Sequence, residues 1–76
     1  MNIAQLKKSA KLIALLNRPE DRGRLELYRS ENGYYLFNDL LRSDINNSPP
    51  TKLSEASARK EFSRAYTKLV VDEDAF

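Results

Sequence analysis

The strongest constraint on the fold is a change in hydrophobic period at Arg24. From residue 24 to residue 29 apolar and polar side chains alternate, which is the pattern of a half-buried β-strand. Residues 30–33 read Ser-Glu-Asn-Gly, a composition typical of tight turns, and residues 34–37 are rich in strand-forming side chains. We therefore predict a β-hairpin over residues 24–41.

Two registers of this hairpin are compatible with the turn. A two-residue turn at Asn32 and Gly33 would pair Tyr28 with Phe37 and would mix apolar and polar side chains on each face. A three-residue loop that begins one residue earlier, with Gly33 in a left-handed conformation, would pair Leu27 with Phe37. We favour this loop because four apolar residues then share a core face: Leu25, Leu27, Tyr35 and Phe37.

Helical spacing flanks the hairpin on both sides. Apolar residues recur every three or four positions near the N-terminus and predict a helix over residues 3–17, which Pro19 would end. Ser54 can cap a second helix, predicted over residues 55–69. Its buried stripe would contain Ala58, Phe62, Ala65, Tyr66 and Leu69. Between hairpin and helix, residues 40–45 are expected to prolong the second strand or form a short third one, and residues 46–50 a loop.

Together these elements predict a small single α+β domain over residues 1–76, ordered helix, β-hairpin with a possible short third strand, helix. We expect both helices to cover one face of the sheet, with the other face free for a second copy. Helices on opposite faces are the alternative. Residues 70–76 contain three acidic residues and no basic one, and we expect them to be a frayed acidic tail.

The composition excludes most catalytic chemistry. The chain has no histidine and no cysteine, which removes the usual proton shuttle near neutral pH, thiol nucleophiles and most ligands for transition metals. With only two glycines, Gly23 and Gly33, it has no glycine-rich phosphate loop. The acidic residues have no spacing that forces them to converge. We therefore expect no enzymatic activity, no cofactor and no metal.

Binding of another protein is the function that the pattern favours. With the favoured register, the second hairpin face carries an apolar, aromatic cluster that resembles the core of a protein interface, and an unpaired strand edge lies beside it. A symmetric dimer would bury this face and enlarge a core that is small for a chain of 76 residues. We expect an adaptor, regulator or inhibitor that forms a homodimer through Tyr28, Tyr34 and Leu36.

Nucleic-acid binding is the alternative function. The net charge is +2, and both predicted helices carry basic residues at helical spacing. Such stripes can neutralise phosphates and give affinity that falls as salt rises. The residues concerned are Lys7, Lys8, Lys11, Lys60, Arg64 and Lys68.

Targeting signals are weak in this sequence. The apolar run at residues 12–16 is shorter than the core of a signal peptide, and no stretch approaches the length of a membrane span. We therefore expect a cytoplasmic protein without a membrane partner.

Overall fold

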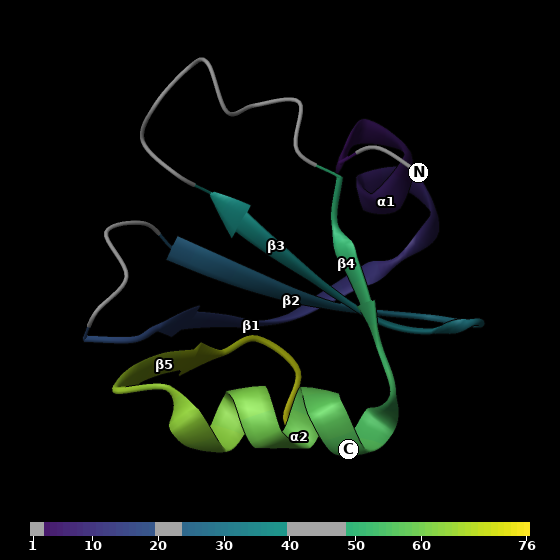
Figure 1. Ribbon diagram of the computed structural model, residues 1–76. Helices are drawn as coiled ribbons and strands as arrows, with labels where there is room; N and C mark the ends of the chain where they lie inside the picture. Colours follow the sequence, from purple (N-terminus) through teal and green to yellow (C-terminus); the bar gives the residue numbers. More distant parts are fainter. Residues whose placement is uncertain (1–2, 20–23, 40–48) are drawn as a thin grey trace.

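Five strands form one antiparallel sheet in the order β4-β3-β2-β1-β5 (Figure 1). The computed structural model describes residues 3–19, 24–39 and 49–76. The elements in these ranges are α1 (Ile3–Ser9), β1 (Lys11–Asn17), β2 (Arg24–Ser30), β3 (Gly33–Asp39), β4 (Thr51–Leu53), α2 (Glu55–Arg64) and β5 (Thr67–Val70). The predicted small α+β domain is confirmed, with more strands than the hairpin alone.

The first segment folds as a short helix followed by a strand. The predicted helix over residues 3–17 is therefore wrong in its second half, since α1 ends at Ser9 and β1 begins at Lys11. β1 lies inside the sheet between β2 and β5. Its core, residues 12–16, is apolar at every position, which suits a strand with both faces in contact with other residues. Pairing of β1 with β2 and β5 therefore stabilises an extended conformation, although the spacing of the same apolar residues favours a helix.

The hairpin of β2 and β3 is confirmed, but its register is neither of the two predicted ones. The turn contains Glu31 and Asn32, so Ser30 lies opposite Gly33 and Leu27 lies opposite Leu36. Gly33 does adopt the positive φ that the prediction required, at 133°. Because a one-residue shift changes the face of every side chain, Tyr35 and Phe37 lie on the opposite face from Leu25 and Leu27.

Both faces of the sheet carry apolar clusters. On one face α2 contributes Ala58 to a cluster with Ile13, Leu16, Leu25, Leu27 and Tyr34. On the other face α1 contributes Leu6 to a cluster with Tyr28, Tyr35 and Phe37. Figure 1 shows the two helices on opposite sides of the sheet. The expectation that both cover one face is thus wrong, and the alternative arrangement is correct because the strands are apolar on both faces.

The second helix begins as predicted and ends early. The Ser57 amide donates a hydrogen bond to Ser54 Oγ over 3.1 Å, which confirms the predicted cap. α2 stops at Arg64, and the following residues form β5 against β1. Thr67, Val70 and Val71 are β-branched and favour extended backbone. Two members of the predicted buried stripe, Tyr66 and Leu69, are consequently exposed.

The acidic C-terminal segment packs against the fold and is not frayed as expected. The Tyr34 hydroxyl and Arg29 Nη1 both donate hydrogen bonds to the Ala75 carbonyl, over 3.2 Å and 3.1 Å. The Phe76 ring stacks on Tyr34 with their centroids 5.5 Å apart. Asp72 forms an ion pair with Lys11. Basic residues of the sheet therefore bind residues 70–76, although the negative charge of this segment had led us to expect a free tail.

The region between hairpin and second helix is described in part. The strand considered for residues 40–45 lies outside the described residues, as do residues 46–48 of the expected loop. Pro49 and Pro50 have no regular secondary structure, and the strand next to β3 is β4, which begins at Thr51.

Candidate protein-binding surface

The three hairpin residues expected at an interface do not form a common surface. Tyr28 is 4% exposed and lies on the α1 side, where its hydroxyl donates a hydrogen bond to Glu26 Oε1 over 2.6 Å. Tyr34 is 7% exposed and lies on the α2 side, together with the partly buried Leu36. The observed register separates these side chains, and both tyrosines have partners within the chain.

The six basic residues of the alternative function are also divided between surfaces. Lys7 and Lys8 are exposed in the last turn of α1, whereas Lys60 and Arg64 belong to α2 on the other side of the sheet (Figure 1). The remaining two, Lys11 and Lys68, are in strands rather than helices. The predicted stripes are thus broken by the change from helix to strand.

Three of these basic residues contact groups within the chain. Lys11 Nζ lies 3.0 Å from Asp72 Oδ2, and Arg64 Nη1 lies 3.5 Å from Glu61 Oε1. Lys68 Nζ lies 4.7 Å from the centre of the Phe62 ring, a cation–π distance. Their charge is therefore partly used for internal contacts, and the structure does not collect the six residues into one phosphate-binding surface.

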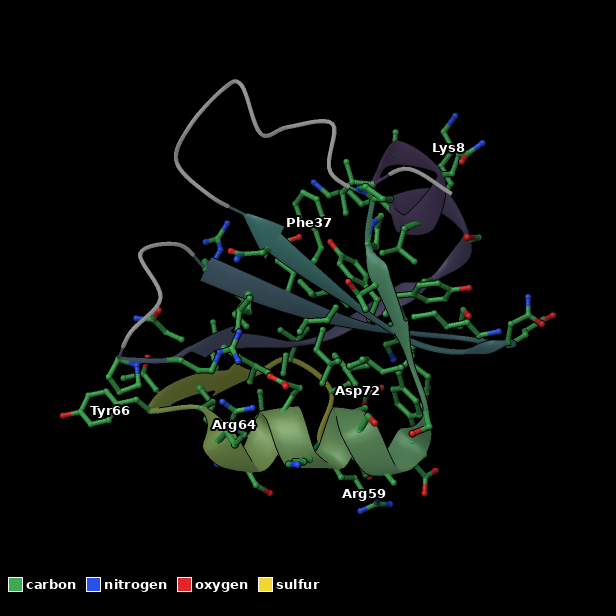
Figure 2. The ribbon with its side chains drawn as sticks, viewed as in Figure 1. Lys8, Phe37, Arg59, Arg64, Tyr66 and Asp72 are labelled. Atoms are coloured by element: carbon green, nitrogen blue, oxygen red, sulfur yellow. The ribbon has the colours of Figure 1, made fainter. Side chains whose placement is uncertain are left out.

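Exposed apolar side chains gather instead around β5. Four of the exposed large hydrophobic residues are consecutive or nearly so: Tyr66, Leu69, Val70 and Val71. Tyr66 is 76% exposed and Leu69 is 61% exposed, and Figure 2 shows Tyr66 pointing away from the fold. Because β5 is the last strand of the sheet, one side of its backbone has no neighbouring strand in the described chain. An edge strand with apolar side chains is a common site of association.

Pairing with β1 places the side chains of β5 on defined faces. Leu69 lies opposite Leu15, on the α1 side of the sheet, and Lys68 lies opposite Leu16, on the α2 side. The α1 cluster covers the sheet around Tyr28 and ends before this corner. A shallow cavity of about 280 Å³ lies there, lined by Leu15, Leu16, Asn17, Arg24, Thr67, Lys68 and Leu69. Exposed apolar area thus continues from the edge of β5 onto the sheet face.

The two edges of the sheet differ in their protection against pairing. At the other edge, β4 has only three residues, follows Pro49 and Pro50, and carries the exposed Lys52. Short strands, prolines and lysines are devices that discourage association at an edge. β5 is only one residue longer and also carries an exposed lysine, but no proline adjoins it and the ammonium group of Lys68 lies over Phe62. β5 is therefore the less protected edge.

Asp72, two residues after the end of β5, forms an ion pair with Lys11 at the start of β1. Lys11 donates a hydrogen bond to its carboxylate, and the Asp74 amide donates another over 3.1 Å. These contacts, with the nearby charges of Lys11 and Arg29, hold the pKa of Asp72 below its ordinary value. The contact fixes the chain where it leaves β5, and the amides of Val71 and Asp72 both donate to the Ile13 carbonyl.

Sequence analysis missed the β5 surface because it assigned these residues to a helix and a frayed tail. The signal that could have identified it is local. Residues 66–71 read Tyr-Thr-Lys-Leu-Val-Val, a run rich in aromatic and β-branched side chains. The four-residue spacing from Phe62 to Tyr66 concealed this signal.

Comparisons with protein-family models, curated proteins and solved structures find no match. Within residues 3–19, 24–39 and 49–76, no three potential metal ligands cluster. The helices of the same ranges include none that is long and apolar enough to cross a membrane. The function is therefore argued from the β5 surface and from the basic residues.

Proposed function

We propose that this chain is a small non-enzymatic protein-binding module, an adaptor, regulator or inhibitor that binds a strand of another chain along the outer edge of β5. A homodimer is one form of this association. The observation that supports the proposal most directly is the exposure of Leu69 and its apolar neighbours on an edge strand. The proposal moves the contact surface from the hairpin, where Tyr28 and Tyr34 are buried, to the edge of the sheet.

The physical basis is strand addition. An extended segment beside β5 would satisfy the unpaired main-chain N–H and C=O groups of the edge, which supplies affinity without a deep pocket. The side chains on alternate faces then determine which segment fits. Leu69 on the α1 side, next to the cavity at Leu15, would accept an apolar side chain of the bound strand.

Site-specific photocrosslinking tests this proposal. A photoreactive amino acid replaces Leu69 in one variant and the exposed Lys60 of α2 in a matched control, and both are produced in the native cells. We expect the variant at position 69, but not the control, to be crosslinked to a discrete protein, either a second copy or another chain. Adding Val71→Asp should abolish this product, because a carboxylate would replace an apolar contact. Equal crosslinking at both positions, or none at position 69, would reject the proposal.

Nucleic-acid binding remains the second candidate function. The adjacent Lys7 and Lys8 are exposed in the last turn of α1, a helix that has no acidic residue in its first turn. Two exposed lysines in one helical turn add positive charge that can neutralise phosphates. Fluorescence anisotropy with labelled DNA and RNA at two salt concentrations tests this function. Binding that weakens with salt and in the Lys7→Gln, Lys8→Gln double variant would support it, and no binding at low salt would reject it.

A further inference from the structure

We infer that the strand bound at the β5 edge is β5 of a second copy, in an antiparallel register centred on Leu69. The two five-stranded sheets then become one continuous sheet. This inference rests on the proposed function and names the partner of that surface. Three features of the described chain support it: the charge distribution along the β5 segment, the position of Lys68, and the apolar row that includes Leu15.

The charge of the β5 segment changes sign from one end to the other. Residues 60–66, before β5, carry two basic residues and one acidic one, Glu61, which pairs with Arg64; residues 71–76, after it, carry three acidic residues and no basic one, with Glu73 and Asp74 exposed. In an antiparallel pair related by a two-fold axis, the beginning of one β5 lies beside the end of the other. The basic end of each copy would therefore face the acidic end of its partner at both ends of the joint. A parallel pair would bring like charges together.

The position of Lys68 selects the register. In a symmetric antiparallel pair that keeps the faces of the two sheets continuous, one residue lies opposite its own copy, and the two-fold axis passes between the two. The two residues nearest the middle of β5 are Lys68 and Leu69. An axis at Lys68 would place two ammonium groups directly opposite each other, which is unfavourable. An axis at Leu69 places the two leucines opposite each other and Lys68 opposite Val70. An axis at Val70 would place Lys68 opposite Asp72, which lies beyond the end of β5 and is already paired with Lys11.

The register centred on Leu69 also buries the exposed apolar corner of the sheet. Leu15 lies opposite Leu69 within one chain, on the α1 side. Across the joint, Leu15 and Leu69 of one copy would meet Leu69 and Leu15 of the other in a single row. The lining of the cavity next to Leu15 would contact the partner in both copies. Lys68 would remain on the α2 side, over Phe62.

Disulfide trapping in purified protein tests the register directly. The natural chain has no cysteine, so each introduced cysteine is unique. Directly opposed residues of antiparallel strands have Cα atoms about 4.5 to 5.5 Å apart, within the range that a disulfide spans. Under mild oxidation we expect Leu69→Cys to form a covalent dimer. Lys68→Cys and Val70→Cys should each form no covalent dimer alone, and should form a mixed disulfide when combined.

Sedimentation over a wide range of protein concentration tests the association itself. We expect the mass of the natural chain to rise toward that of a dimer, and that of Leu69→Asp to remain monomeric. Thr51→Asp is the matched control because it adds the same charge to the exposed edge strand β4. It should dimerise like the natural chain. Circular dichroism verifies that each variant is folded.

The outcomes separate this inference from the proposed function. A monomeric natural chain whose Leu69→Cys variant forms no covalent dimer would overturn the second copy as partner. The crosslink at position 69 to a different protein would still support the proposed function in that case. Self-linking of Lys68→Cys without that of Leu69→Cys would overturn the register. Dimerisation that Leu69→Asp does not weaken would place the interface elsewhere and would count against both.

Discussion

The Tyr34 hydroxyl donates a hydrogen bond to the main-chain carbonyl of Ala75, 3.2 Å away and 41 residues later in the chain. The same tyrosine stacks on Phe76, whose ring also meets Phe62 edge-on at 5.7 Å and lies 4.8 Å below the Arg59 guanidinium. A strand of the hairpin, the helix α2 and the C-terminal segment are thus connected by one aromatic cluster. Tyr34 stabilises the tertiary structure by these contacts.

Replacing Tyr34 with phenylalanine should lower stability moderately. The ring would still stack on Phe76, but the hydrogen bond to Ala75 would be lost, while Arg29 would continue to donate to the same carbonyl. We expect a loss of about 0.5–1.5 kcal/mol in the free energy of unfolding, measured by urea denaturation. Tyr66→Phe is the matched control because its side chain is exposed, and it should change stability little. Equal effects of the two changes would contradict this assignment.

Tyr28→Phe distinguishes an internal role from an interface role. Its hydroxyl donates to the carboxylate of Glu26, which is 7% exposed and has Arg24 Nη2 3.6 Å from its other oxygen. Losing a donor to a buried carboxylate should reduce the free energy of unfolding by about 1–3 kcal/mol. The concentration dependence of the mass in solution should not change. Weaker association at unaltered stability would return Tyr28 to the contact surface.

Stability should depend on pH through Asp72. Its contacts with Lys11 and the Asp74 amide lower its pKa in the folded chain below the ordinary value of 3.8, so the folded state binds a proton less readily than the unfolded state. The stabilisation is therefore complete above that ordinary value and is lost as the pH falls through the lowered pKa. Asp72→Asn should destabilise the protein more at pH 7 than at pH 2.

Denaturant titrations at these two pH values would measure the difference for Asp72→Asn. Glu73→Gln provides the control, because this neighbouring carboxylate is exposed. It should alter the pH dependence less than Asp72→Asn does. A larger effect of the Glu73 change would mean that the contact with Lys11 contributes little.

Gly33→Ala should destabilise the hairpin because of backbone conformation. The φ of Gly33 is 133°, a value that residues with a side chain rarely adopt. An added Cβ would have space, since its nearest neighbour is the Leu53 carbonyl oxygen at 3.5 Å. We expect a loss of about 1–3 kcal/mol, read from thermal or urea unfolding. Asn32→Ala, in the same turn but without positive φ, should stay within about 0.5 kcal/mol.

Local signals in the sequence predicted the elements whose causes are local. The hairpin of β2 and β3 follows from alternation and from the turn before Gly33, and the start of α2 follows from the hydroxyl of Ser54. Such signals did not predict the register in which β2 pairs with β3. Both faces of the hairpin are apolar, so hydrophobic pattern did not distinguish the observed pairing of Leu27 with Leu36 from pairings shifted by one or two residues.

The contact surface proposed from the structure contains other residues than the surface expected from the sequence. Association through an unpaired edge and an apolar surface was expected, and the proposal retains both, but the residues have changed from Tyr28, Tyr34 and Leu36 to those around Leu69. The residues differ because Tyr28 and Tyr34 are buried in the structure, whereas Leu69 is exposed. Whether an apolar side chain is buried depends on which helix covers which face, and α1 is too short to cover the corner at Leu15.

The sequence by itself determined that the chain forms a small α+β domain with a hairpin, a capped helix and neither histidine nor cysteine. Only the tertiary structure decided that Lys11–Asn17 and Thr67–Val70 are strands. Each segment continues a helical spacing of apolar residues that begins before it in the sequence, and β1 becomes extended because β2 and β5 satisfy its main-chain groups on both sides. These partners lie far away in the chain, so no local pattern contains them. The same pairing leaves β5 at the edge and exposes Leu69.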